Sequence, residues 1–163
     1  MHDPVGPALW VWLETTALAA AMREWLWLYP IVEIVHIAGF VLLVGTVALF
    51  DLRVLGAARG PAVDALARFM LPWAWVGLAV AAPSGLLMFS AHATEMIENP
   101  VFQLKLALLA AAGLNAWLFH RGVFRTVYEW ASTTPPLRAR FSAAASLGLW
   151  LGVIACGRLL AYL

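Results

Sequence analysis

Long apolar stretches alternate with short polar segments along this chain and predict four membrane-spanning helices. Each stretch is interrupted by at most one or two ionisable side chains. A helix needs about 20 apolar residues to cross a hydrocarbon core of about 30 Å. The predicted fold is therefore an all-α, integral membrane four-helix bundle. Its expected spans cover about residues 31–52, 67–91, 101–121 and 140–162.

The first 29 residues predict a different element. Residues from about 8 to 28 favour helix, but Glu14, Arg23 and Glu24 interrupt their apolar character. Four tryptophans lie in this segment, and tryptophan prefers the headgroup layer of a membrane. We expect residues 1–29 to form an amphipathic helix on the outer membrane surface, ahead of the bundle over residues 30–163. A cleaved signal peptide is the alternative, although the segment lacks a basic leading region.

The composition excludes a soluble class of protein. Hydrophobic residues make up 64% of the chain and charged residues 12%. A water-soluble domain of 163 residues could not bury that much apolar surface in one core, whereas lipid requires no such burial. The lipid bilayer is therefore the first expected partner.

The charges predict an orientation, because most basic residues fall in the loops after the first and third spans. The net charge is only +1, but the acidic residues gather mainly on the opposite side. Basic loops stay in the cytoplasm, so both termini are expected outside, in the periplasm if the membrane is a bacterial inner membrane. These arginines are topology signals in this interpretation, and no nucleic-acid partner is expected. The loop arginines are Arg53, Arg59, Arg68, Arg121, Arg125, Arg138 and Arg140.

Ionisable residues inside the spans are the candidate site. His36, Lys105 and Arg158 each lie about 7–9 Å below the outer end of a predicted helix. An unpaired charge at that depth costs at least about 2.5–3.5 kcal/mol, so such residues usually have a functional or structural partner. Glu33 lies one turn above His36, and we expect it to be the anionic partner of Lys105 or Arg158.

Helical angles extend this site into a predicted polar network. Asp51 follows Glu33 by eighteen residues, which is five turns, so both are expected to point the same way. Lys105, Asn115 and His120 fall within about 140° of one another on the third span. Asp51 and Arg53 form an expected charge pair at the end of the first span. Buried hydrogen bonds that hold helices together would produce the same pattern. The expected network is Glu33, Asp51, Arg53, Asn115 and His120.

Histidine and methionine side chains raise the possibility of a bound metal or haem. His36 and His120 differ by about 24 Å along the membrane normal and cannot share one haem. His92 lies about 10 Å further out than His36, whereas Met88 lies within about 4–5 Å of its level. Met88, His92 and Met96 follow at intervals of four residues and share one stripe if the helix continues that far.

Thioether with imidazole is a ligand set for Cu(I), and a histidine–methionine pair also ligates haem iron. The expected ligands are His36, Met88 and His92. Lys105 and Arg158 would neutralise haem propionates at the outer edge. The predicted cofactor is therefore haem b or copper.

Many of these residues belong to a combination that extends over nearly the whole chain. Its members are Tyr29-Pro30, Glu33, His36, Gly45-Thr46, Asp51-Leu52-Arg53, Leu55-Gly56, Pro72-Trp73, Gly85, Asn99-Pro100, Phe102, Lys105, Asn115, Phe119-His120 and Gly157-Arg158. The combination resembles a bacterial four-helix inner-membrane family catalogued as a domain of unknown function. That resemblance implies the fold and topology and carries no established activity. In architecture alone the chain is distantly similar to copper-resistance D proteins and to small membrane b-type cytochromes.

Three functions from different classes remain open. The first is a redox or metal-handling protein with b-type haem or copper in the outer half of the bundle, served by a periplasmic redox protein or a second copy of the chain. The second is a transporter, either of a small solute or one coupled to proton movement. The third is a structural or accessory subunit of a membrane complex. Hydrolase and kinase functions lack any motif in the sequence.

Overall fold

The computed structural model describes residues 6–57 and 60–162, and in these ranges the chain is helical with no strand. Four helices are long and apolar enough to cross a membrane by length and composition. The predicted all-α architecture with four such helices is therefore confirmed. The long helices are α3 (Leu28–Leu55), α4 (Val63–Ala91), α6 (Pro100–Arg121) and α8 (Leu137–Leu159). They begin one to four residues earlier than the spans expected from hydropathy.

Local signals explain where these helices begin and end. Pro30 lies in the first turn of α3, where its missing N–H costs no hydrogen bond. Asn99 caps α6, since its side chain accepts a hydrogen bond from the backbone N–H of Val101 at 2.9 Å. Gly56 follows α3 with φ +81°, a left-handed conformation that glycine adopts without strain.

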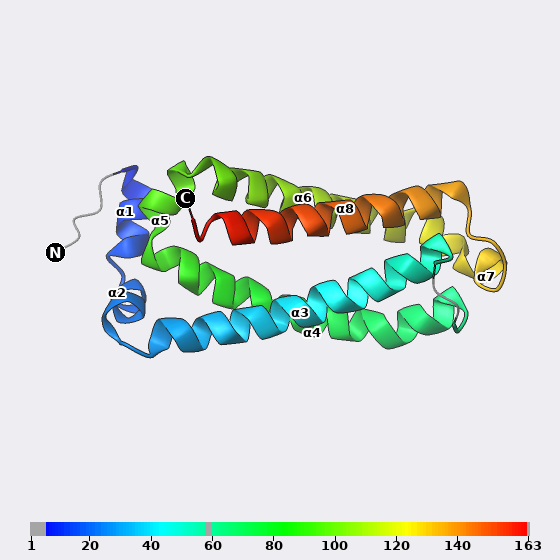
Figure 1. The fold of residues 1–163 in the computed structure, drawn as a ribbon, viewed down its shortest axis with the longest axis horizontal. Helices are drawn as coiled ribbons and strands as arrows, with labels where there is room; N and C mark the ends of the chain where they lie inside the picture. The colour runs from blue at the N-terminus through cyan, green and yellow to red at the C-terminus, as the bar shows by residue number, and fades with distance from the viewer. Residues whose placement is uncertain (1–5, 58–59, 163) are drawn as a thin grey trace.

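The long helices are arranged as two pairs, which Figure 1 shows as two layers. Helix α3 packs along α4, α6 packs along α8, and contacts between α3 and α8 join the pairs. In the described ranges the backbone of α6 approaches neither α3 nor α4. Aromatic side chains bridge that separation near both ends, where Phe89 stacks on Phe102 and Phe50 meets Phe119 edge to face.

The α3–α4 pair is held at an unusually short backbone separation by two glycines. A Cβ atom added at Gly77 would lie 2.6 Å from the backbone nitrogen of Leu43 and 2.8 Å from the carbonyl oxygen of Gly39. One added at Gly39 would lie 2.8 Å from the backbone nitrogen of Ala81. Small residues at four-residue spacing allow helix backbones to meet in this way in membranes, where van der Waals packing drives helix association.

The N-terminal segment differs from the single amphipathic helix expected over about residues 8–28. It forms two short helices, α1 (Ala8–Glu14) and α2 (Ala17–Glu24). The break falls at Thr15 and Thr16, because the Thr16 side chain caps α2 by accepting a hydrogen bond from the backbone N–H of Ala19. The prediction of one continuous helix was therefore wrong.

This segment is fastened to the bundle by a buried carboxylate. Glu14 is 1% exposed, and its Oε1 accepts hydrogen bonds from the backbone N–H and the hydroxyl of Thr94, at 2.6 and 2.8 Å. Thr94 belongs to the short helix α5 (Ala93–Glu98). Arg23 donates to the backbone carbonyls of Glu14 and Ala91, which ties α2 to the same place. Helices α1, α2 and α5 therefore cover one end of the bundle (Figure 1).

The opposite end holds the main hydrophobic cluster. A short 3₁₀ helix, η1 (Val123–Thr126), and helix α7 (Val127–Trp130) lie between α6 and α8 at this end. Their side chains pack with the ends of α3, α4, α6 and α8. The cluster contains Phe50, Val54, Val63, Ala67, Phe119, Val127, Trp130, Ala131, Ala139 and Ala143.

Candidate functional site

His36 lies on α3 and faces α4, with its ring half-buried. Its Nδ1 lies 2.9 Å from the carbonyl oxygen of Ala81 and 3.2 Å from the hydroxyl of Ser84. A carbonyl oxygen can only accept a hydrogen bond, so Nδ1 carries the proton. The Nε2 of the neutral ring then holds the free lone pair, and the described residues form no hydrogen bond with it.

Gly85 makes room for this imidazole. A Cβ atom at Gly85 would lie 2.9 Å from Cε1 and 3.3 Å from Nδ1 of His36. Gly77, Ala81 and Gly85 therefore form one stripe of small residues on α4, which brings the backbone of α3 close and seats the ring. Gly85 belongs to the pattern described from the sequence, but this stripe was not predicted from it. The four-residue spacing of small residues indicates close helix packing.

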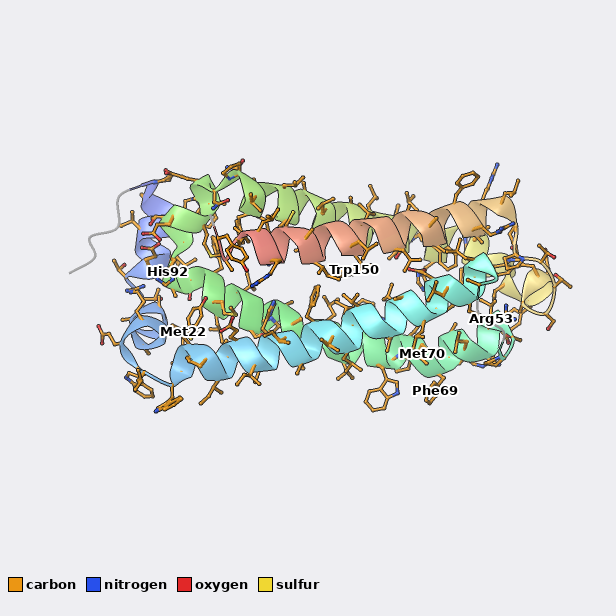
Figure 2. All side chains as sticks on the ribbon, in the orientation of Figure 1. Met22, Arg53, Phe69, Met70, His92 and Trp150 are labelled. Atoms are coloured by element: carbon orange, nitrogen blue, oxygen red, sulfur yellow. The ribbon has the colours of Figure 1, made fainter. Side chains whose placement is uncertain are left out.

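Aromatic rings continue the site from His36 toward α8. Phe40 stacks on His36 with ring centroids 6.4 Å apart and planes inclined by 21°. Trp150, labelled midway along α8 in Figure 2, meets Phe40 edge to face at 6.0 Å. The interior between α3 and α8 is therefore lined by three rings, of which only the imidazole offers a metal ligand.

The structure brings only one of the two predicted cations into the neighbourhood of His36. Lys105 is half-buried on α6 and interacts electrostatically with His36 on α3 and with Cys156 on α8, and Glu33 also contributes to the electrostatic environment of His36. Arg158 instead donates to the hydroxyl of Tyr162, in the turn that follows α8, and lies 4.5 Å over that ring. Glu33 is exposed and makes no ion pair with any residue that the structure describes, so its predicted pairing with Lys105 or Arg158 was wrong.

The predicted ligand stripe of Met88, His92 and Met96 is interrupted. Helix α4 ends at Ala91, and His92 leaves the helical conformation with φ −143° before α5 begins. The ring of His92 meets that of Tyr29 at 6.5 Å. Tyr29 precedes His36 by seven residues, so His92 lies about 10 Å outward of His36 along the helix axis.

Met88 stays a predicted partner of His36. It follows Gly85, whose backbone packs against the His36 ring, by three residues on α4, which is about one helical turn. Within residues 6–57 and 60–162, no group of three or more His, Cys, Asp or Glu side chains is placed to hold a metal ion. Of the predicted ligands, His92 is therefore separated from His36, whereas the pairing of His36 with Met88 stays a prediction.

Two residues of the predicted polar network lie at helix contacts, and one of them, Asn115, is an interhelical clamp. Asp51 is buried on α3 near Ser146 of α8, and its Oδ2 has no hydrogen-bond partner among the described residues. Asn115 on α6 donates to the carbonyl oxygen of Ser142 at 3.0 Å and accepts from its hydroxyl at 2.9 Å. Helix α8 thus holds α6 through Ser142 and presents Ser146, four residues later on the same face, to Asp51 of α3.

The remaining network residues lie away from this interior. Arg53 donates to the carbonyl oxygen of Pro61 in the α3–α4 connection, 2.9 Å away. Exposed His120 bonds the carbonyl oxygen of Ala116 on its own helix. Glu33 and Asp51 also differ, since Glu33 is exposed and Asp51 is buried. The prediction of one continuous inward-facing polar seam was therefore wrong.

The geometry leaves one candidate centre, which consists of His36 seated on α4, two aromatic rings and the charge of Lys105. Comparison with protein-family models, with curated proteins and with solved structures gave no match to this chain. The family resemblance drawn from the sequence therefore stays an expectation, and the centre has to be interpreted from its own chemistry.

Proposed function

We propose that the protein is a multi-pass protein of a bacterial inner membrane that binds a b-type haem in the outer half of its bundle, with His36 as a ligand to the iron. A bound haem would supply one-electron transfer. The partner would be a redox protein on the outer side of the membrane.

The orientation rests on the distribution of charge between the two ends. All the described arginines except Arg23 and Arg158 lie at the end of the bundle that contains α7; Figure 2 labels Arg53 there and His92 at the other end. The end covered by α1, α2 and α5 carries most of the acidic residues. Positively charged loops are retained in the cytoplasm, so the arginine-rich end is assigned to that side and His36 to the outer half.

The observation that carries the haem assignment is the state of the His36 ring. Its Nδ1 donates a hydrogen bond to the carbonyl oxygen of Ala81, and its Nε2 keeps the lone pair. Metal-ligating histidines are oriented in this way, because a hydrogen bond from the second nitrogen fixes the tautomer and makes the ligating nitrogen more basic. Gly85 and Ser84 hold the ring in place from α4.

A haem fits this donor set better than copper does. The porphyrin brings four nitrogen ligands of its own, so a single protein imidazole is enough, as in proteins with one proximal histidine. A copper ion takes all its ligands from side chains, and His92 lies about 10 Å outward of His36, so that at most His36 and Met88 of the predicted set would remain to hold it. Lys105 supports the same assignment, since a propionate carboxylate is an anionic partner for a half-buried ammonium group.

The proposed haem would lie between the two helix pairs. The backbone of α6 does not approach α3 or α4 within the described ranges, and the bridging rings lie near the two ends of that interval. His36 and Lys105 belong to opposite sides of the interval and interact across it. His36 would hold the iron, Phe40 and Trp150 would exclude water, and Lys105 would balance the charge of a propionate.

The test is the absorption spectrum of the full chain, purified in detergent from cells grown with iron and copper. We expect a Soret band, about one haem per chain by the pyridine haemochrome assay, and no stoichiometric copper. The His36→Gly variant should lose the band, and added imidazole should restore it by occupying the vacated position. His120→Gly is the matched control and should keep the haem, because that exposed ring bonds only its own helix.

Three results would overturn the proposal. Colourless wild-type protein without iron would remove the cofactor and favour the transporter or accessory-subunit functions. Copper in place of haem would show that the ligand set had been misassigned. Full haem content in His36→Gly without imidazole would show that another residue binds the iron.

A further inference from the structure

A cavity of about 420 Å³ opens at the arginine-rich end, away from the proposed haem site. Its walls come from the first turns of α4, from η1 and from α7. The polar lining consists of Asp64, Arg68, Arg125 and Tyr128. The apolar lining includes Leu71, Phe124 and Val127, which pack in or against the hydrophobic cluster at this end. The cavity therefore combines a charged rim with an apolar floor.

The rim keeps a net positive charge after its internal ion pair is counted. Arg68 pairs with Asp64 at 2.9 Å, one turn away on α4. The side chain of Arg125 is exposed and makes no hydrogen bond or ion pair with any described residue. Tyr128 is 76% exposed and adds a phenolic hydroxyl beside these guanidinium groups. One guanidinium group thus faces the cavity without a counter-charge.

The surrounding surface indicates where this cavity lies relative to lipid. Phe69, Trp73 and Trp75 are exposed on the same stretch of α4, and Figure 2 labels Phe69 and Met70 along that edge. Exposed tryptophan beside arginine is typical of the layer where headgroups meet acyl chains. A ligand that enters from this layer presents an anionic group to the rim and an apolar chain to the floor.

We propose that this cavity binds an anionic phospholipid of the inner leaflet, with its phosphodiester on Arg125 and Arg68 and an acyl chain against Leu71 and Phe124. Arginine suits this role because its planar fork of donors matches phosphate oxygens. Basic pockets between membrane helices on the cytoplasmic side bind such headgroups. A small soluble anion would use the rim but would leave the apolar floor without a partner. The site does not depend on the haem proposal.

The test measures lipid binding to the full chain by native mass spectrometry in detergent. We expect phosphatidylglycerol to bind more tightly than phosphatidylcholine. Arg125→Gln should weaken phosphatidylglycerol binding about fivefold, since one arginine near an anionic headgroup contributes about 1 kcal/mol. Arg140→Gln is the matched control, because Arg140 is exposed at the same end but does not line the cavity. It should leave binding within twofold of wild type.

The opposing outcomes are distinct. Equal binding of the two lipids would reduce the site to an apolar groove and overturn the proposal. Equal losses in Arg125→Gln and Arg140→Gln would show a diffuse charge effect, which also overturns it. Full displacement of phosphatidylglycerol by millimolar inorganic phosphate would assign the rim to a soluble anion instead. Thermal unfolding of both variants should match wild type, because both side chains are exposed.

Discussion

Replacing Gly77 by alanine tests the contact that holds α3 against α4. The added Cβ would lie 2.6 Å from the backbone nitrogen of Leu43, where ordinary van der Waals contact begins at 3.4 Å. The obstacles are backbone atoms of Leu43 and Gly39, which cannot turn away as the end of a side chain can. The two helices would have to separate by about 0.8 Å, the difference between these two distances.

The expected cost follows from comparison with a second glycine. Overpacking of a tight contact costs about 1–3 kcal/mol. Glycine to alanine in a helix also gains about 0.5–1 kcal/mol from backbone entropy, which hides part of that cost. Gly45→Ala gives the entropic gain alone, because Gly45 lies in α3 with nothing within 4 Å of its added Cβ. The free energies of unfolding of the two variants should therefore differ by the steric cost of about 1–3 kcal/mol.

The assay is reversible unfolding in mixed detergent micelles, followed by tryptophan fluorescence and far-ultraviolet circular dichroism. Gly77→Ala should unfold at a lower denaturing-detergent fraction than wild type, and Gly45→Ala at an equal or higher one. Equal stability of the two variants would refute the close crossing of α3 and α4. It would also remove the seat of His36, because that ring depends on the same pair of helices.

Two further predictions concern the clamps between elements. Alanine substitution of Asn115 and Ser142, singly and together, should give a coupling energy of about 0.6–1.7 kcal/mol, the range for hydrogen bonds between membrane helices. Additive losses in the free energy of unfolding would contradict the clamp. Glu14→Ala should raise amide hydrogen exchange of α1 and α2 at least tenfold, because hydrogen bonds to a charged group contribute about 1.5–3 kcal/mol and two reach Thr94. Exposed Glu24→Ala is the control. Equal exchange in both variants would contradict the role of the Glu14–Thr94 hydrogen bonds in holding α1 and α2.

The sequence predicted the local features of the fold well, in particular where the long helices lie. Hydropathy predicted four long apolar helices, and the observed helices begin within four residues of the expected spans. These features depend on composition and on hydrogen bonds within a few residues. The split between α1 and α2 was missed because the capping threonines lie within an otherwise helix-favouring stretch.

The inward faces were harder to predict, and the polar residues show why. Glu33 and Asp51 lie five turns apart, yet Asp51 is buried beside Ser146 and Glu33 is exposed. Helical angle alone does not say which neighbour is present at each depth. In lipid the apolar pattern gives little further help, because a side chain that faces acyl chains is as apolar as one that faces another helix.

The sequence by itself determined the four apolar helices, the charge difference between the two ends and the presence of a histidine deep in the first of these helices. Only the tertiary structure decided that Gly39 and Gly77 bring α3 and α4 together. That contact seats His36 against Gly85, and the end of α4 at Ala91 leaves His92 beside Tyr29. The physical reason is that helix pairing in a membrane depends on the closeness of backbone approach, which the order of apolar residues does not encode.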